Sequence, residues 1–233
     1  MKQTKAVFND RTHAYEKNDP YCIDHISLFN TLTTEQKEQV KSLIHIKYYD
    51  HGETIYSPGQ TADALYILKS GTLRIYRLAD TGKEQLIRMV PEGEFTGELA
   101  LFKKGIYEAF AEAKTNCCIW AIKHSDFRQL LIQYPEISIK MLSTISERLG
   151  SSEQQTAWAT TETVKERLLH FLISLVHSQE KEPIVELNMA KKDLASYLGT
   201  TSESLSRELA RLVKERVIEE VAYGKIKLMN VYP

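Results

Sequence analysis

Seven of the ten glycines in this 233-residue chain lie between residues 52 and 105, and short segments of alternating character separate them. Leu73–Arg77 and Gln85–Met89 are two such segments. Short strands with a turn signal roughly every 8–12 residues are typical of an antiparallel sandwich or a double-sheet roll. Strand signals continue from Phe110 to Ile122. The first half of the chain is therefore predicted to be a β-roll.

A helical period replaces the strand pattern after residue 123. A short helix is expected to open at Ser125, and a longer one to run from Glu136 to about Ala159. Ahead of the strands, residues 34–46 also have a helical pattern, with Thr34 as the candidate cap. The chain therefore changes from strands to helices near its middle.

The long helix carries an apolar stripe at spacings of three and four residues, formed by Leu142, Ile145 and Leu149. This spacing is typical of a seam between two helices. In the next heptad the seam reaches the polar Ser152, which would weaken its far end. The stripe could pack on its own domain or pair with a second copy of the chain, and the spacing alone leaves both readings open.

Local signals mark the boundaries that follow. Thr163 and Glu166 fit a capping box, which would start a new helix that runs to about His177 and leave residues 159–162 as a short hinge. The rest of the chain reads as two short helices, a third segment and a strand pair that turns at Gly224. This pattern predicts a small second domain of mixed helices and strands.

Charge and composition narrow the classes of protein. Apolar residues make up 42% of the chain, enough for a real core. The 30 lysines and arginines nearly balance the 31 acids, which excludes a strongly basic nucleic-acid coat and an acidic solvating tail. Any binding of nucleic acid must therefore use a local surface.

The lack of recognisable targeting signals and the pattern of cysteines both favour a cytoplasmic location. No apolar run approaches the roughly 18 residues that a membrane-spanning helix needs, and the polar residues 1–18 lack the apolar centre of a secretory signal. The three cysteines, Cys22, Cys117 and Cys118, do not suit a disulfide framework. We expect a cytoplasmic protein with mostly reduced thiols.

Residues 191–209 carry the pattern of a helix-turn-helix. The motif needs a small residue where its helices cross, a glycine that can take positive φ in the turn, and an apolar residue that docks the second helix. Ala195, Gly199 and Leu205 meet these needs at the right spacing. Glu208 stands where a further apolar residue is usual, and Leu209 is expected to supply that packing together with Leu212.

The second helix of this motif is expected to start near Ser202. Its N-terminal residues that point away from the apolar face are the ones that a recognition helix presents to the major groove. Arginine can bond guanine at two atoms, and glutamate can accept from cytosine, whereas hydroxyls and free amides at a helix start hold phosphate. The candidate DNA contacts are Glu203, Ser206, Arg207, Ser202, Thr201 and Lys192.

Structural alternatives exist for two of these residues. Thr200 and Glu203 also fit a capping box, so the glutamate could cap its own helix. Arg207 could pair with Glu203 four residues earlier. Residues 191–227 hold eight basic and six acidic side chains, a net charge of about +2, so two copies of the domain and low salt would favour binding.

The roll, the long helix and the helix-turn-helix together resemble the CRP/FNR family of bacterial transcription regulators, from about Ile26 to Tyr232. Residues 93–102, GEFTGELALF, are similar to the family's phosphate-binding segment. Residues 198–207, LGTTSESLSR, resemble the FNR branch, and the FNR-like proteins (FLP) of low-GC Gram-positive bacteria most closely. The resemblance implies a homodimer joined by the long helix, a TTGAT-like palindrome as target, and RNA polymerase as a partner.

Two family features are missing from the sequence. Members that bind cyclic AMP place an arginine and a serine where Tyr107 and Glu108 stand here, and although Glu98 is retained, a carboxylate at position 108 would repel a phosphate. We therefore expect no high-affinity response to cyclic AMP. Oxygen-sensing members hold an iron–sulfur cluster on four cysteines, which three cysteines in one chain cannot supply.

The cysteines suggest a redox sensor, also by resemblance. FLP-type proteins are implicated in a thiol–disulfide switch between an N-terminal cysteine and a cysteine of the roll. Cys118 is near that roll position, which Trp120 occupies, and only one of Cys117 and Cys118 could face Cys22 because neighbours on a strand point to opposite sides. Alternatively, both strand cysteines are small core residues and Cys22 is a free thiol.

An enzyme is the main rival from another class. A cupin-like metalloenzyme needs two or three histidines and a carboxylate around a metal. The seven histidines are scattered, with no His-x-His pattern and none between residues 52 and 105. We expect no catalytic residue, no metal and no cofactor.

The sequence thus predicts an α+β protein that acts as a dimeric, sequence-specific transcription regulator, independent of cyclic AMP and without an iron–sulfur cluster. A regulator that depends on a cyclic nucleotide or another small ligand is the alternative. The predicted domains are a polar arm (1–25), a β-roll sensor (26–134), a long dimerisation helix with a hinge (135–160) and a winged helix-turn-helix (161–233).

Overall fold

The computed structural model describes residues 23–102, 105–176 and 183–229. The chain divides into two compact units. The first contains residues 1–75 and 90–142, and the second contains residues 76–89 and 143–233. The long helix α4 (Pro135–Thr161) has residues in both units.

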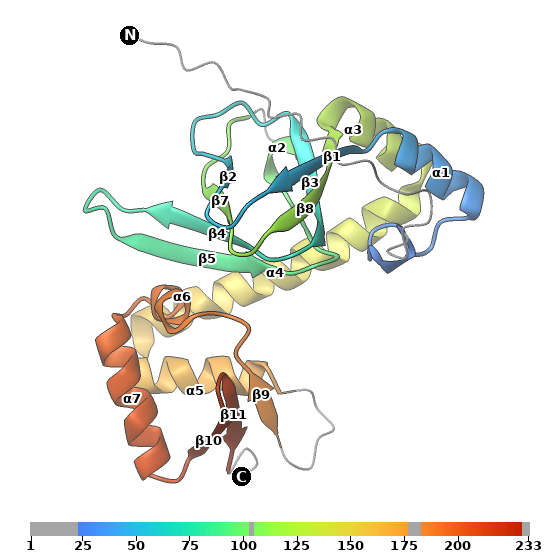
Figure 1. The fold of residues 1–233 in the computed structure, drawn as a ribbon. Coiled ribbons are helices and arrows are strands. Elements are labelled where there is room, and N and C mark those ends of the chain that lie inside the picture. The colour runs from blue at the N-terminus through green and yellow to red at the C-terminus, as the bar shows by residue number, and fades with distance from the viewer. Residues whose placement is uncertain (1–22, 103–104, 177–182, 230–233) are drawn as a thin grey trace. The chain divides into compact units, whose positions relative to one another are not determined.

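Eight strands form two four-stranded sheets (Figure 1). The first sheet has the order β1-β8-β3-β6, with β1 at His45–Tyr49, β8 at Cys117–Lys123, β3 at Ala64–Ser70 and β6 at Phe95–Thr96. The second has the order β2-β7-β4-β5, with β2 at Thr54–Tyr56, β7 at Phe110–Ala113, β4 at Leu73–Leu78 and β5 at Glu84–Val90. This arrangement is the predicted roll.

The core of the first unit lies along β3 and β8. These strands pair antiparallel, with Ile67 opposite Trp120 and Leu65 opposite Ile122. Nearly every residue of both strands is buried, whereas a strand with one wet face would alternate. Gly71, at the tight turn after β3, has φ +97°, and a Cβ there would lie 2.6 Å from the Asn116 carbonyl oxygen. Only glycine fits this turn without strain.

Helices flank the roll. They are the 3₁₀ turn η1 (Ile23–His25), α1 (Thr34–Ser42), α2 (Leu99–Phe102) and α3 (His124–Gln133). The predicted cap of α1 is wrong by one residue, because Thr33 accepts from the Gln36 amide and completes a capping box. The predicted extension of this helix to Ile46 is also wrong, since Ile46 lies in β1 opposite Trp120.

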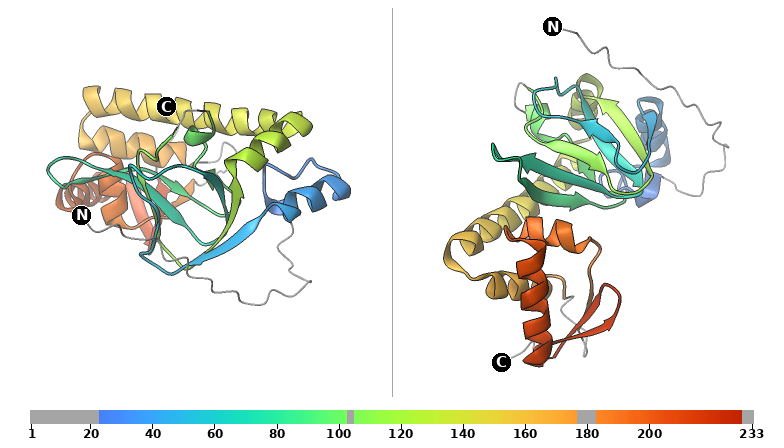
Figure 2. Two further views of the ribbon diagram at one scale, coloured as in Figure 1. Left: turned by 90° about the horizontal axis from the view of Figure 1, so that it is seen from above. Right: turned by 60° about the vertical axis from the view of Figure 1, so that its left-hand side comes forward.

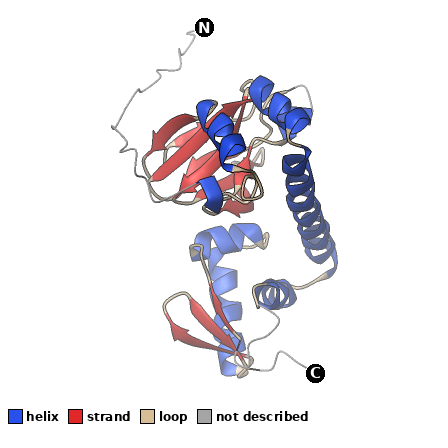
Figure 3. Ribbon diagram, turned by 90° about the vertical axis from the view of Figure 1, so that its right-hand side faces the viewer, coloured by secondary structure: helices blue, strands red, loops and turns tan. Residues whose placement is uncertain are grey.

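The second unit contains α5 (Val164–Ser174), α6 (Lys191–Tyr197), α7 (Ser202–Lys214) and a three-stranded antiparallel sheet of order β10-β11-β9. These strands are β9 (Ile184–Glu186), β10 (Ile218–Ala222) and β11 (Lys225–Leu228). We call the β10–β11 hairpin the wing; it projects beside α7 in Figures 2 and 3. The hairpin turns at Gly224, with φ +72°, as predicted.

The boundary between α4 and α5 differs in part from the prediction. Thr163 and Glu166 form the predicted capping box. However, α4 continues through Thr161, so the break is shorter than residues 159–162. The α5 helix ends at Ser174, with Leu175 as its C-cap, so the predicted end near His177 is about three residues too far along the chain.

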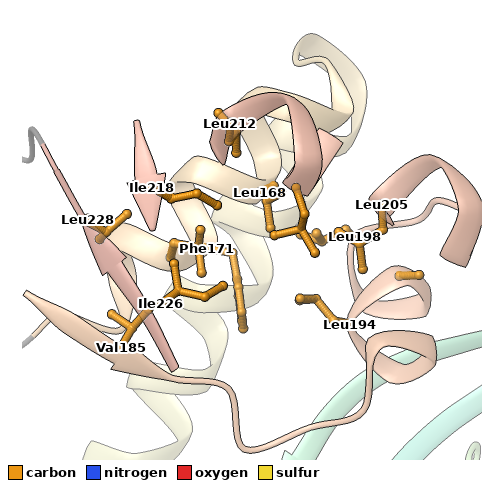
Figure 4. Packing of buried hydrophobic residues seen from close by; sticks show 13 residues of the cluster. Leu168, Phe171, Val185, Leu194, Leu198, Leu205, Leu212, Ile218, Ile226 and Leu228 are labelled. Atoms are coloured by element: carbon orange, nitrogen blue, oxygen red, sulfur yellow. The ribbon is translucent and has the colours of Figure 1, made fainter. Parts of the chain in front are cut away.

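One apolar cluster holds the second unit together (Figure 4). Leu168 and Phe171 of α5 meet Leu205 and Leu212 of α7, and Ile226 of the wing closes the cluster. Each side chain is removed from water, which favours folding by about 1.5–3 kcal/mol for a large aliphatic or aromatic group. The α+β class, the roll, the long helix and the winged helix-turn-helix of the prediction are confirmed. Among the described residues, none of the helices combines the length and the apolar character that a membrane span requires.

Candidate nucleic-acid interface

The helix-turn-helix consists of α6, a tight turn and α7. Ala195 is buried where the helices cross, and Gly199 takes φ +69° in the turn. The Thr200 amide donates to the Ala195 carbonyl at 2.9 Å, which closes the turn. Leu205 is fully buried and docks α7 on the rest of the motif. The three spacing requirements of the sequence are therefore met.

One face of α7 is buried and the other is free. Leu205, Leu209 and Leu212 point into the cluster. Glu208, the departure from the usual pattern, keeps a quarter of its side chain exposed and lies 3.9 Å from the Arg211 guanidinium. Leu209 and Leu212 supply the apolar packing, as the sequence predicted.

The candidate base-reading residues lie together at the N-terminal end of α7. Ser202, Glu203, Ser206 and Arg207 are all exposed. Their helix begins there, so its first amides lack partners within the helix. Side chains that donate and accept hydrogen bonds, next to free backbone amides, are typical of a surface that binds duplex DNA.

The capping alternative for Glu203 is wrong. Thr201 caps α7, with its hydroxyl accepting from the Ser204 amide at 3.2 Å. Thr200 is therefore not the cap, and the Glu203 carboxylate is not needed to close the helix. The Thr201 hydroxyl also donates to the Ser204 hydroxyl at 3.1 Å, so its first role is structural.

The pairing alternative for Arg207 is also not observed. Its Nε donates to the backbone oxygen of Glu203 at 3.5 Å. Among the residues that the structure describes, no ion pair joins this guanidinium to the Glu203 carboxylate. Both charged groups thus remain exposed and available to a ligand.

The far end of α7 is electrostatically different. Glu215 lies 2.9 Å from Arg211 and 2.5 Å from Lys165. Hydrogen bonds from Lys165 and Arg211 hold the pKa of Glu215 below its usual value, and the bond to Glu215 raises the pKa of Arg211. Lys165 and Arg211 are thus already paired with an acid, whereas Arg207 near the N-terminal end has no ion pair among the described residues.

Lys192, the remaining candidate contact, is at the start of α6. Its side chain is largely exposed, and its Nζ lies 3.8 Å from the Glu84 carboxylate of β5. Both residues belong to the second unit. The lysine therefore has an acidic neighbour, which sequence reasoning did not anticipate because more than a hundred residues separate them.

The stripe of α4 is exposed along most of its length. Leu142 is 62% exposed and Leu149 is 58% exposed, Ser152 is exposed, and Ile145 is half-buried. Ile139, three residues before Leu142, is also exposed and extends the stripe. Ile139 was not among the predicted seam residues, although its spacing of three residues from Leu142 indicates the same face of the helix.

Three tyrosines of the roll, Tyr56, Tyr66 and Tyr107, pack against one another, and one of them, Tyr107, belongs to the predicted ligand site. Tyr107 is buried, its ring stacks on Tyr56 at 3.9 Å between centroids, and its hydroxyl donates to the Ala64 carbonyl at 3.1 Å. Burial raises the pKa of Tyr107 to about 12. Glu98 is buried, but Glu108 is exposed. Of the three predicted ligand-site residues, the structure thus buries Glu98 and Tyr107 and leaves Glu108 exposed.

The structure describes two of the three cysteines. Cys117 and Cys118 are both buried on β8. The Cys117 thiol donates to the Thr115 carbonyl at 3.2 Å. Cys22 lies outside the described residues. Within the described ranges, no group of three or more His, Cys, Asp or Glu side chains is arranged to hold a metal.

Comparisons with known proteins agree with this geometry. The family model of the cyclic nucleotide-binding domain matches residues 46–134, and that of the Crp-like helix-turn-helix domain matches residues 166–231. A protein of Lacticaseibacillus casei named probable transcriptional regulator flp is 33% identical over 209 residues, which cover 90% of this chain and 94% of that protein. The chain belongs to the CRP/FNR family. It is a DNA-binding transcription regulator of this family and not an enzyme.

Other relatives of this regulator are more distant. The cyclic AMP receptor protein of Thermus thermophilus is 26% identical over 84% of this chain and 97% of its own. Among solved structures, a CooA mutant from Carboxydothermus hydrogenoformans has a TM-score of 0.77 at 20% identity and covers 88% of this chain and 92% of its own. FixK2 from Bradyrhizobium japonicum has a TM-score of 0.67 at 22% identity and covers 81% and 93%. These two likenesses show the fold.

Proposed function

We propose that this regulator binds a TTGAT-like palindrome as a homodimer, with one recognition helix α7 in each half-site, and that it needs neither cyclic AMP nor an iron–sulfur cluster. The observation that carries the proposal is the joint exposure of Glu203, Ser206 and Arg207 on a helix whose opposite face is buried. Neither charged side chain of this set is consumed by a cap or by their mutual pairing.

The roles follow from chemistry. Arg207 can bond two acceptor atoms of guanine, and Glu203 can accept from the amino group of cytosine. Ser202, Ser206 and the amides at the start of α7 would contact phosphate and set the register. Thr201 would act mainly by capping, and Lys192 would contact phosphate at the start of α6.

The exposed stripe of α4 supports the dimer. Ile139, Leu142 and Leu149 repeat at spacings of three and seven residues, as in a two-helix seam. A monomer that left these side chains in water would lose the free energy of burying them. Paired helices would also hold two α7 helices at a fixed separation, which must match about one turn of the duplex.

Two observations support independence from the known effectors of the family. The stacked rings of Tyr107 and Tyr56 take up space where the resemblance places the clamp of a cyclic phosphate, and the nearby Glu108 would repel an anion. The three cysteines of a chain are one fewer than an iron–sulfur cluster of four thiolates requires.

A ligand-dependent regulator remains the second candidate. The match to the cyclic nucleotide-binding domain over residues 46–134, together with the buried Glu98, favours it. In that case the roll would still sense a small molecule, of another class than cyclic AMP. Contact with RNA polymerase, the domain boundaries at residues 25, 134 and 160, and a cytoplasmic location are parts of the same proposal.

The test is fluorescence anisotropy with a labelled duplex that holds two TTGAT half-sites one helical turn apart. We expect binding at least tenfold tighter than to a duplex with scrambled half-sites, weaker binding at higher salt, and no change on addition of cyclic AMP. Equal affinity for the two duplexes would contradict base reading. A large increase with cyclic AMP would favour the second candidate.

A further inference from the structure

Ser196, on the first helix of the DNA-reading motif, is hydrogen-bonded on both sides to strand β5. Its hydroxyl donates to the Glu84 carbonyl at 2.8 Å and accepts from the Leu86 amide at 2.7 Å. The Gln85 side-chain amide donates to the Ser196 carbonyl at 2.9 Å. In Figure 1, β5 runs beside α6 at this point. These groups all lie in the second unit.

The position of β5 in its sheet explains why a serine fits there. β5 is an outer strand in the order β2-β7-β4-β5, so one of its edges has no ladder partner. Residues 84 and 86 are two apart and turn their backbone groups to the same edge. One hydroxyl, which both donates and accepts, satisfies two of these groups.

A pair of opposite charges also links β5 to α6. The Glu84 side chain lies 3.8 Å from Lys192 Nζ, at the start of α6. A further hydrogen bond, from Gln155 of α4 to the Tyr197 carbonyl at 2.7 Å, fixes the other end of α6. Helix α6 is therefore held by the β4–β5 hairpin along one side and by α4 at its C-terminal end.

We propose that the contact of Glu84, Gln85 and Leu86 with Lys192 and Ser196 is an autoinhibitory clasp that opens when the protein binds DNA. The inference rests on the proposed function in one respect, the role of Lys192 as a phosphate contact. A phosphate that reaches Lys192 meets the Glu84 carboxylate, and two anions beside one ammonium group repel each other. The clasp and the DNA backbone therefore compete for the same lysine.

The charge arm of the test compares two variants of the hairpin. Glu84→Gln removes the competing carboxylate, and Asp80→Asn removes the same charge from an exposed position of the same hairpin, outside the contact with α6. The probe is the TTGAT duplex, with a scrambled duplex beside it. We expect Glu84→Gln to tighten binding to both duplexes about three- to tenfold and Asp80→Asn to change it less than twofold. Equal gains, or no gain from Glu84→Gln, would overturn the clasp.

The second part of the test measures the contact between Ser196 and β5 with a variant that does not change the charge. In hydrogen exchange of the full chain, Ser196→Ala should speed exchange of the Leu86 amide at least tenfold, because that amide loses its acceptor. Exchange in residues 205–212 should stay unchanged, which shows that the helix-turn-helix is still folded. In the wild type, saturating DNA should also speed exchange at Leu86. Unchanged or slower exchange in either case refutes the proposal.

The two proposals fail in different ways. A wild type that binds no duplex at low salt contradicts the proposed function, whereas Ser196→Ala still tests the contact itself. A wild type that reads the palindrome while Leu86 stays protected in the complex contradicts the clasp alone.

Discussion

The Tyr107 ring lies parallel to the Tyr56 ring, with 3.9 Å between their centroids and 13° between their planes. Tyr56 in turn shares a hydrogen bond of 2.6 Å with Thr96 of β6. Tyr107, which stands where the resemblance to cyclic-AMP-binding members implies a phosphate clamp, is thus part of an aromatic core. These contacts stabilise the roll at the position where cyclic-AMP-binding relatives are expected to hold their ligand.

The first prediction concerns that stack. Tyr107→Ala should destabilise the protein by about 3–4 kcal/mol, because it removes a large buried side chain and leaves a cavity. Tyr223→Ala is the control, since Tyr223 is 105% exposed at the tip of the wing, and its effect should stay within about 0.5 kcal/mol. Chemical denaturation, followed by the fluorescence of Trp120 and Trp158, measures both. Equal effects would mean that the stack contributes nothing.

The second prediction concerns base reading. Arg207→Ala should weaken binding to the palindrome by about 1–3 kcal/mol and relax the preference at a single base pair. Lys214→Ala removes one positive charge from the exposed last turn of the same helix and should leave the preference intact. Anisotropy titrations on duplexes with single substitutions measure the preference. Loss of the same size on every sequence would show that Arg207 contacts only phosphate.

The third prediction concerns the stripe of α4. Leu142→Glu combined with Leu149→Glu should convert a dimer to a monomer, because four like charges would meet at a buried seam. Ile132→Glu places the same charge on α3, at a residue that is 81% exposed, and should leave the dimer intact. Sedimentation equilibrium measures the mass. A wild type that is monomeric at micromolar concentration contradicts the seam.

The fourth prediction concerns pH. Bonds from Lys165 and Arg211 lower the pKa of Glu215 in the folded protein below its usual value of 4.5. The contribution of this carboxylate to stability is therefore present above that value and is lost as the pH falls through the lower, folded pKa. Glu215→Gln should lower the melting temperature at pH 7, and the difference from wild type should shrink toward pH 3. Glu219→Gln, at an exposed site on β10, should show no such trend.

The fifth prediction concerns the thiols. Cys117 and Cys118 are buried, so both should react slowly with a thiol reagent until the protein is denatured. If Cys22 forms a disulfide with one of them, mild oxidation leaves one free thiol per denatured chain. Three free thiols after oxidation would rule out the switch.

The sequence predicted the parts of the fold that follow a repeating pattern. The roll follows from glycines between short strands, and the helix-turn-helix follows from the spacing of Ala195, Gly199 and Leu205. The capping box at Thr163 was also predictable, because its partners are three residues apart. These signals are local, so a single chain displays them without its folded context.

Errors arose where one residue decides between two similar local structures. Thr33 and Thr34 can both cap α1, as can Thr200 and Thr201 for α7, and the sequence does not distinguish neighbours. Ile46 continues a helical pattern but lies in β1, since its pairing with Trp120 prevails over local propensity. The stacking of Tyr56 on Tyr107 and the bonds of Ser196 join distant segments, for which the sequence has no periodic signal.

The hydrogen bonds of Ser196 also affect how readily this protein aggregates in solution. An outer strand with bare amides and carbonyls is a template on which a foreign strand can assemble. The Ser196 hydroxyl bonds the Glu84 carbonyl and the Leu86 amide at the edge of β5. Two of the backbone groups with which a foreign strand would pair are therefore already occupied. A chain that has lost this serine is therefore expected to precipitate sooner on gentle warming, long before its core melts.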